Sequence, residues 1–561
     1  MNKIKYILIL ASGLLAFSSC AFLTEKSLTE IDKNEYINDA DEAESVLNGV
    51  YRTLVEDGAY AMNLSFFLNM GTDISQVEGS STENWRIVPT NAFPTTQSQI
   101  QETWQVLYKG IYRANDFLER VSLKMDEYTE EDYARTVIYI AEARCLRAMF
   151  YFELVRRWNI VPLITSTAQS YQKSDEFVQA DPEDVYEFIE KDLRYAADIL
   201  PYATEDIYRK NNHYRFSKGA ALGLLAKVYC TWAGWPVQNT EKWKDAVEVA
   251  GSLIHSGKHD LLPDYEQLWK NTCNGQWDPT ESLIEISVYS PTSGGGSSDP
   301  CGRIGKWNGV KTTALAGERG SCAANQYAVL SFVYDWREHA GDIRCGLSVA
   351  NYKYSNDWVL ICKSSSDTEE KALENEADPT KKQKEKQAYT PAKWDEQKYV
   401  SSFNRLINND KSNINWYFLR YSDVLLLYAE AINELYGGPT AEAYSAINKV
   451  RRRGYGNPDD TSVCDLKSLD YTSFQKAVRD ERKWELAFEG HRRTDLVRWG
   501  IYYETIQETD KALKTIWSPD NKDPYNYVVA KYTVKGKSEL LPIPQREKDL
   551  CKQFKQNPGW E

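Results

Sequence analysis

The stretch with the densest group of reactive side chains runs from Asp480 to Gly500 and reads DERKWELAFEGHRRTDLVRWG. Its charges around His491 could perform general acid–base chemistry, or they could tie one helix to its neighbours through Arg–carboxylate pairs. Catalysis would need an acid–base pair in a cleft or a metal cluster. The chain has only five histidines, His491 has no HExxH partner, and no CxxC spacing occurs. The pattern favours structural ion pairs, so we expect no catalytic residue, metal or cofactor.

This stretch is predicted to lie on one amphipathic helix. Its apolar side chains fall at i, i+3, i+4 and i+7 and form a single stripe of Trp484, Ala487, Phe488 and His491. On the charged side, Glu489 and Arg493 are four residues apart, a spacing that allows an ion pair on a helix surface. Other helices must then supply partners for the remaining charges.

The residue pattern in the rest of the sequence predicts a mainly α-helical protein. Segments 131–158, 217–233 and 241–256 show apolar residues three and four apart, and Ser217 is a suitable N-cap. A second helical hairpin reads SDVLLLYAEAINELYGG and then PTAEAYSAINKVRRR, where glycines end one helix and a proline helps to start the next. Helix pairs of about 34 residues are typical of tetratricopeptide repeats. We therefore expect tetratricopeptide-like helix pairs that support an irregular, loop-rich region with a few short strands.

Between residues 281 and 410 the helical spacing fades. SLIEISVY (282–289) and WVLICK (358–363) are typical of strands, and YNYVVAKYTV near the end of the chain also predicts a short strand. Segment 366–387 is a charged insertion with almost no core-forming residues, and it is predicted to be solvated and mobile. The expected organisation is one composite domain, 20–561, with three parts: a helical part at 20–280, an irregular ligand or partner region at 281–410, and a helical part at 411–561.

Residues 1–19 are expected to be a targeting segment rather than part of the fold. Lys3 and Lys5 precede the apolar run YILILASGLLAF, which is too short to span a bilayer, and small residues follow it before Cys20. A cysteine in this position resembles the lipoprotein box, in which the thiol receives a lipid and the segment before it is removed. An ordinary secretory signal with an incidental cysteine is the alternative.

Charge and composition narrow the choice of partners. Without residues 1–19, 65 Lys and Arg face 81 Asp and Glu, which gives a net charge of −16. Nucleic acids and anionic membrane surfaces bind basic patches, so neither is an expected partner. The chain also carries 17 Trp and 37 Tyr, and such amphipathic rings favour interfaces and carbohydrate-type sites.

Several stretches, in this order, resemble the SusD-like (RagB) family of outer-membrane nutrient-binding lipoproteins. The matching stretches are WQVLYKGIYRANDFLE, AEARCLRAMFYFELVRRWNIVPLI, DVYEFIEKDLRYAADILP, RFSKGAALGLLAKVY, RYSDVLLLYAEAINEL, ERKWELAFEGHRRTDLVRWG and the terminal LLPIP. Cys20 followed by Phe22 and Leu23 is similar to the start of the mature family members. The resemblance spans nearly the whole mature chain, and it departs from the family pattern at Asn159, where glycine is common, and in the insertion 366–387.

The resemblance implies a function and a set of site residues. Members of the family are lipid-anchored at the outer membrane, are exposed at the cell surface, and catalyse no reaction. They bind an oligosaccharide, a polysaccharide or another nutrient and hand it to a SusC-like TonB-dependent transporter that they cap. The family places ligand residues in loops that correspond to 71–86 and to 301–310 and the region after it. The resulting candidates are Asp73, Trp85, Arg86, Trp307 and Trp358.

Each of these interpretations has an alternative. Trp85 and Trp307 could be core or interface rings, and Asp73 could cap a turn. For the function, a non-carbohydrate nutrient such as a peptide, or a tetratricopeptide-type adaptor that binds only protein, would also fit. A glycoside hydrolase that uses two carboxylates is the least favoured, because no such pair stands out in the sequence.

Overall fold

The computed structural model describes residues 36–79, 82–208, 213–289, 301–312, 321–354, 389–401, 410–516 and 527–561. Several expectations lie outside these residues: the targeting segment 1–19, Cys20, the strand at 358–363 with Trp358, and the insertion 366–387. These expectations stay predictions, and so does the division of the chain into three parts.

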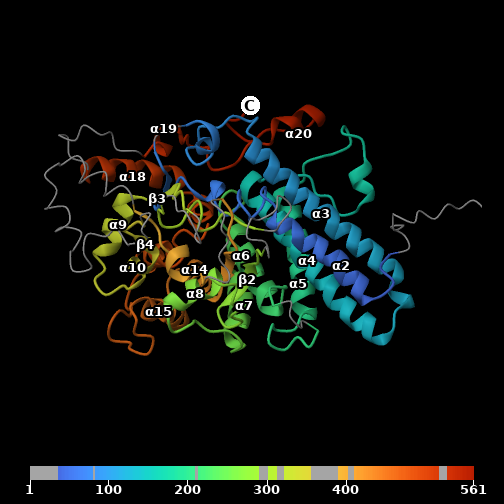
Figure 1. The fold of residues 1–561 in the computed structure, drawn as a ribbon, viewed down its shortest axis with the longest axis horizontal. Helices are drawn as coiled ribbons and strands as arrows, with labels where there is room; N and C mark the ends of the chain where they lie inside the picture. Colours follow the sequence, from blue (N-terminus) through green and yellow to red (C-terminus); the bar gives the residue numbers. More distant parts are fainter. Residues whose placement is uncertain are drawn as a thin grey trace, which may run out of the picture.

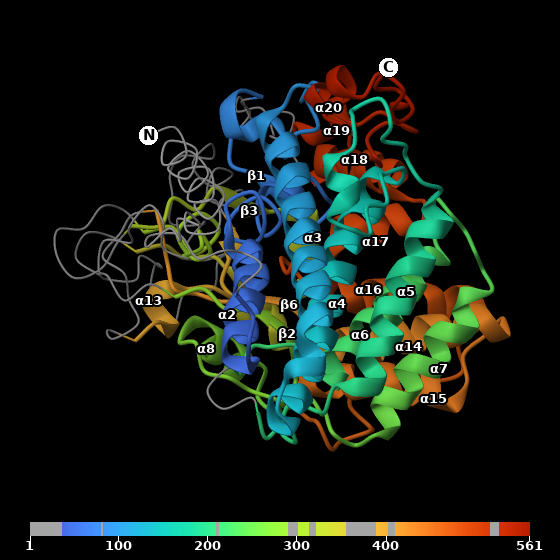
Figure 2. The same cartoon turned by 90° about the vertical axis from the view of Figure 1, so that its right-hand side faces the viewer.

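The described residues form a mainly helical protein, as the sequence predicts (Figure 1). Consecutive helices pack on one another from α3 to α7, and α7 then packs on α14, which packs on α15. Figure 2 shows α3 and α4 side by side, with α5, α6, α7 and α14 beside them. The helices are α2 (Ala40–Tyr51), α3 (Ser98–Lys124), α4 (Glu130–Trp158), α5 (Pro182–Ile199), α6 (Lys218–Trp232), α7 (Lys242–His255), α8 (Tyr265–Cys273), α9 (Leu330–Arg337), α10 (Arg344–Ser348), α13 (Glu396–Tyr399), α14 (Tyr421–Tyr436), α15 (Ala441–Gly454), α16 (Tyr471–Glu485), α17 (Arg492–Arg498), α18 (Tyr502–Ile516), α19 (Val529–Tyr532) and α20 (Gln545–Leu550).

Local signals explain where the long helices begin and how closely they pack. The Ser217 side chain accepts a hydrogen bond from the backbone N–H of Ala220 and caps α6, which confirms the predicted N-cap. Gly437 ends α14 in the left-handed conformation, with φ of 68°. Gly110 of α3 allows the close approach of α4, because a Cβ at this position would lie 2.5 Å from the Phe150 ring. The predicted helices at 131–158, 217–233 and 241–256 are confirmed.

Three antiparallel strand pairs join parts of the chain that are distant in sequence. They are β1 (Ser75–Val77) with β3 (Gln326–Ala328), β2 (Ser282–Ile286) with β6 (Trp416–Arg420), and β4 (Val349–Ala350) with β5 (Thr390–Pro391). The strand predicted in SLIEISVY is confirmed as β2. The strand predicted in YNYVVAKYTV is wrong, because its centre forms the helical turn α19, from which Val529 packs against Gly71.

The single helix predicted across Asp480–Gly500 is also wrong. Helix α16 ends at Glu485, and the chain turns through Phe488 and Gly490, with φ of 67° and 83°, before α17 begins. Gly490 is needed here because a Cβ would lie 2.6 Å from the Asn69 amide and 3.0 Å from the Trp416 ring. Tertiary contacts with distant residues therefore end the helix at a point that the local residue pattern does not mark.

The turn also separates two charges that the sequence would pair. Glu489 accepts hydrogen bonds from Arg420 and Lys393 at 2.7 Å each, instead of pairing with Arg493. Arg493 donates to the Tyr502 hydroxyl at 2.7 Å and to the Asn91 side chain at 3.0 Å. The i, i+4 pair expected for a continuous helix does not form, because Glu489 and Arg493 lie on opposite sides of the break.

The charges of this region join a buried charge network, which confirms the predicted Arg–carboxylate pairs between elements. Glu485 lies at its centre and receives ion pairs from Arg453 at 2.5 Å, Arg420 at 2.9 Å and Arg344 at 3.0 Å. Five carboxylates face five cations. The members are Asp342, Glu281, Glu481, Glu485, Glu489, Arg344, Arg420, Arg451, Arg453 and Lys393.

Burial alone would raise the pKa of Glu485, but the three arginines lower it below its usual range. The carboxylate is therefore held as an anion inside the protein. The network joins several elements, namely α15, α16, β6 and the segment before α10. Removing one member would leave its partners buried with an unbalanced charge.

Glu485→Gln is expected to lower the free energy of unfolding by about 3–5 kcal/mol, because three buried arginines lose their shared anion. The measurement is the midpoint of urea unfolding followed by circular dichroism. The matched control is Glu504→Gln, which removes an exposed pair with Lys535 and should shift the midpoint little. Equal shifts for the two variants would contradict a structural role for the network.

Glu285 of β2 is a buried carboxyl group of a different kind. It accepts hydrogen bonds from Asn415 at 2.9 Å, Ser282 at 3.0 Å and Thr272 at 3.3 Å. Burial raises its pKa to about 7 from a usual 4.5. The folded protein therefore holds a proton here that the unfolded chain releases at lower pH.

The contribution of Glu285 to stability is expected to fall as pH rises from about 4.5 to about 7, because the folded state binds more protons than the unfolded state in this window. The shift corresponds to about 3 kcal/mol. Urea unfolding measures the stability of the unmodified chain and of Glu285→Gln at several pH values. As the pH rises from about 4.5 to about 7, the variant should gain stability relative to the unmodified chain. A difference that is independent of pH would contradict the raised pKa.

Candidate functional site

Two of the residues proposed from the sequence, Trp85 and Trp307, come together at the protein surface. Their ring centroids are 6.3 Å apart and their planes meet at 51°. Phe66 and Phe67 lie beneath them, with centroids 5.7–6.3 Å from both indoles. The two phenylalanines are buried whereas the tryptophans are only half-buried. We call these four residues the aromatic site.

Trp85 is held by the 3₁₀ turn Asn84–Ile87 and by its neighbour Arg86. The guanidinium carbon of Arg86 lies 4.3 Å from the Trp85 ring centroid, within the range of a cation–π contact. Arg86 in turn donates to the Glu78 backbone carbonyl at 2.9 Å and to its carboxylate at 2.6 Å. The third candidate, Arg86, therefore lies beside the aromatic site in a fixed orientation.

Trp307 lies in the irregular region, on a turn fixed from two sides. Its indole Nε1–H donates to the Asp410 carboxylate at 2.6 Å, and its backbone carbonyl accepts from the N–H of Asn325 at 2.5 Å. The preceding residue, Lys306, is fully buried and pairs with Glu396 of α13 at 2.5 Å. These contacts set the orientation of the indole through its nitrogen, its backbone and the preceding side chain.

The strand pair β1–β3 brings the two loops together. Gln76 pairs with Tyr327 in the register, and the Gln326 side chain donates to the Ser75 hydroxyl at 2.6 Å. The next residue after β1, Glu78, donates its backbone N–H to the Asn325 carbonyl at 2.8 Å. Trp85 follows β1 and Trp307 precedes β3 along the chain, so this short ladder places the two indoles at one surface.

The structure assigns Asp73 to different contacts. Both its oxygens accept from Arg492 of α17, at 2.8 Å and 2.6 Å. This bidentate pair joins the loop after η2 (Phe67–Asn69) to α17. Asp73 is therefore not a member of the aromatic site, and the fifth candidate, Trp358, lies outside the described residues.

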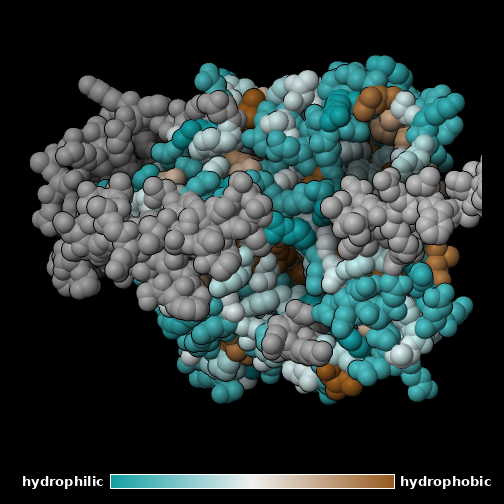
Figure 3. Space-filling model, turned by 45° about the vertical axis from the view of Figure 1, so that its right-hand side comes forward, coloured by the Kyte–Doolittle hydropathy of each residue, from teal (hydrophilic) through white to brown (hydrophobic). Residues whose placement is uncertain are grey.

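The aromatic site combines flat apolar rings with charged groups that contact them, Arg86 over Trp85 and Asp410 at the Trp307 nitrogen. The residue pattern does not single out Phe66, Phe67, Glu78 or Asp410. Long-range contacts bring three of them to Trp307: the Arg303 N–H donates to the Ala61 carbonyl near the two phenylalanines, and the bridge between Gly302 and Ser412 brings Asp410 close. Figure 3 shows one face of the molecule, on which most of the described surface is hydrophilic and apolar side chains are confined to small areas. An arrangement of rings with a polar rim suits reversible binding of an amphipathic ligand.

The described residues contain neither a metal-binding cluster nor a membrane-spanning helix. No group of three or more His, Cys, Asp or Glu side chains there could hold a metal ion. No helix among those residues is long and apolar enough to cross a bilayer.

Known proteins match the chain over most of its length. A family model described as "SusD family" matches residues 324–560, and one described as "Starch-binding associating with outer membrane" matches residues 21–230. The crystal structure of a SusD homologue from Bacteroides thetaiotaomicron is 64% identical, covers 96% of this chain and 100% of that one, and superposes with a TM-score of 0.91. The chain belongs to the SusD family.

More distant SusD-like relatives share both length and fold. A SusD-like protein from Formosa agariphila is 26% identical over 97% of this chain and 96% of its own. A laminarin-binding SusD-like protein of known structure is 25% identical, with 93% and 100% of the two chains covered and a TM-score of 0.66. SusD-like proteins bind glycans without catalysing a reaction, and the chain is accordingly not an enzyme.

Proposed function

We propose that this SusD-family protein binds an oligosaccharide or polysaccharide nutrient at the aromatic site and releases it unchanged. The observation that carries the proposal is the pairing of Trp85 and Trp307 at the surface over two buried phenylalanines. The C–H faces of sugar rings are apolar and stack on flat indoles, whereas sugar hydroxyls need polar partners. Arg86 lies over the Trp85 ring and Asp410 lies at the Nε1 edge of the Trp307 indole, and both can supply such partners.

The angle between the two indoles supports one form of glycan over another. Two indole planes that meet at 51° can each contact a sugar ring only when successive rings change direction along the chain. A curved oligosaccharide fits this arrangement better than a flat ribbon. Laminarin, the ligand named for the relative that is 25% identical, is therefore a suitable first member of a glycan panel.

Trp85→Ala and Trp307→Ala are each expected to weaken glycan binding by at least about tenfold, or about 1.4 kcal/mol, because each removes one stacking face. Isothermal titration calorimetry against the panel measures the effect. The matched control is Trp277→Ala, which removes a half-buried indole that stacks on His213 and should leave binding unchanged. The melting temperature of each variant checks that the fold is intact.

Two results would contradict the proposal in different ways. Absence of heat with every glycan in the panel would remove the carbohydrate part and leave a peptide or other nutrient as the cargo. Release of new reducing ends from a polysaccharide would contradict binding without chemistry.

The proposal includes a place in the cell. A lipid on Cys20 would anchor the chain to the outer membrane at the cell surface, where it would pass its glycan to a SusC-like TonB-dependent transporter. The support comes from the cysteine after the apolar segment and from the matching family model for starch-binding proteins associated with the outer membrane. One lipid chain binds a membrane only marginally, so stable anchoring requires the two or three chains of a bacterial lipoprotein.

Cys20→Ser is expected to move the protein from the outer-membrane fraction to the soluble fraction of its native host, because the thiol that carries the lipid is lost. Fractionation followed by affinity purification in mild detergent measures both parts of the proposal. The unmodified chain should purify with a large outer-membrane barrel protein. A Cys20→Ser variant that stays in the membrane fraction would refute the anchor, and an unmodified chain without a barrel partner would refute the transporter.

A further inference from the structure

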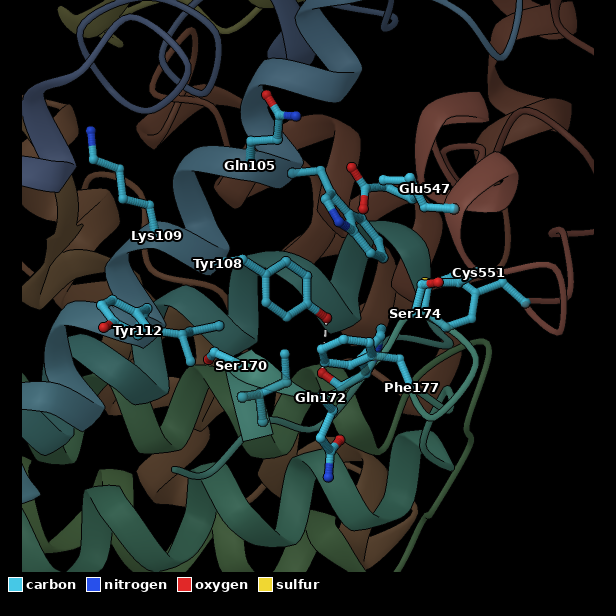
Figure 4. A pocket seen from close by; sticks show the side chains of 16 residues that line it. Gln105, Tyr108, Lys109, Tyr112, Ser170, Gln172, Ser174, Phe177, Glu547 and Cys551 are labelled. Carbon is cyan, nitrogen blue, oxygen red and sulfur yellow. Dashed lines mark hydrogen bonds between the residues drawn. The ribbon is translucent and has the colours of Figure 1, made fainter. Parts of the chain in front are cut away.

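A pocket lies away from the aromatic site and shares no residue with it. It has a volume of about 480 Å³ and opens between α3, the loop that follows α4, and the C-terminal segment that includes α20. Aromatic rings form much of its wall, as Figure 4 shows for the labelled Tyr108, Tyr112 and Phe177. The other two rings that line it are Trp104 and Phe554.

Hydrogen bonds between the walls hold this pocket open. The Tyr108 hydroxyl donates to the Pro162 carbonyl at 2.8 Å, which fixes the ring of α3 against the loop. The loop is also tied to the C-terminal segment: the Gln179 amide donates to the Lys555 carbonyl at 3.0 Å and accepts from its N–H at 2.6 Å. Gln553 adds a bond to the Ser174 carbonyl at 2.8 Å. The walls are therefore built in position before any ligand arrives.

The two charged side chains that line this pocket differ in whether they have an ion-pair partner. Lys109 is the one cation among its lining residues, and Glu56 neutralises it through contacts of 2.8 Å and 2.9 Å. Glu547 is the one carboxylate in the lining, and it is half-buried. Across the described ranges, no side chain forms an ion pair or a hydrogen bond with the Glu547 carboxylate. The pocket therefore contains one carboxylate that no cation of the described residues contacts directly.

The negative charge of Glu547 affects the pKa values of side chains close to it. Burial raises the pKa of Tyr108 and of Cys551, and the negative charge of Glu547 adds to both shifts. Burial also raises the pKa of Glu547 itself, although the nearby Arg546 opposes the shift. In Figure 4 the Glu547 side chain points from α20 towards the rings. A positively charged ligand would satisfy this carboxylate, whereas an anion would be repelled.

We infer that this pocket binds a small organic cation, a protonated amine or a quaternary ammonium group carried on an apolar body. Aromatic faces attract such cations through the negative potential above the ring, and the attraction grows when the site excludes water. Trp104, Tyr108 and Phe177 supply the faces, and Glu547 supplies the countercharge. A neutral sugar could donate a hydroxyl hydrogen bond to Glu547 but would not neutralise its charge, which distinguishes this pocket from the proposed glycan site.

The test compares choline with its uncharged isostere 3,3-dimethylbutan-1-ol, because the two differ mainly in charge. Calorimetric titration of the full chain should show choline binding at least about tenfold more tightly than the isostere. Glu547→Gln keeps the shape of the side chain and should reduce choline binding to the level of the isostere. The matched control is Glu102→Gln, on an exposed turn of α3 outside the pocket, which should leave choline binding unchanged.

A second variant keeps the inference falsifiable if Glu547→Gln does not fold. Phe177→Ala removes one ring, while the bond between Gln553 and the loop backbone is retained, and it should weaken choline binding severalfold. Three results would overturn the inference: no binding of choline, equal binding of choline and the isostere, or full choline binding by a folded Glu547→Gln variant. None of these results would affect glycan binding at Trp85 and Trp307, so the two proposals fail separately.

Discussion

The structure depends on the buried charge network centred on Glu485. Five carboxylates and five cations are removed from water together, and their balance allows burial that any one of them alone would prevent. The same ion pairs set the geometry, because guanidinium groups contact carboxylates in fixed directions. Through Arg344, Arg420 and Lys393, the network attaches α10, β6 and the segment before α13 to the end of α16.

The aromatic site is connected to this network through a short series of contacts. Lys393 pairs with Glu489, and the next residue, Trp394, stacks on Trp416 of β6 with centroids 5.4 Å apart. Two residues further on, Glu396 holds Lys306, which immediately precedes Trp307. The indole is thus oriented by buried ion pairs on the rigid helical part, although it lies on an irregular loop. A binding surface of this kind needs little reorganisation when a ligand arrives.

How much the sequence could predict depends on the range of the interactions. Local periodicity and an N-cap predicted α4 and α6 correctly, because both signals act within a few residues. The break after Glu485 could not be predicted in this way, since Gly490 is required by contacts with Asn69 and Trp416. Trp85 and Trp307 were selected through the family resemblance. Their contacts with Phe66 and Phe67 depend on long-range pairings, among them β1–β3 and the Arg303–Ala61 hydrogen bond, for which the residue pattern carries no signal.

The central claim is that a rigid helical protein presents a preformed pair of indoles that holds a glycan without altering it. The most direct measurement is a crystal structure of the full chain with an intact oligosaccharide from the glycan panel. The account predicts sugar rings stacked on Trp85 and Trp307, with both indoles in the positions that Arg86 and Asp410 already set. A glycan bound elsewhere on the surface, rearranged indoles, or a cleaved oligosaccharide would contradict it.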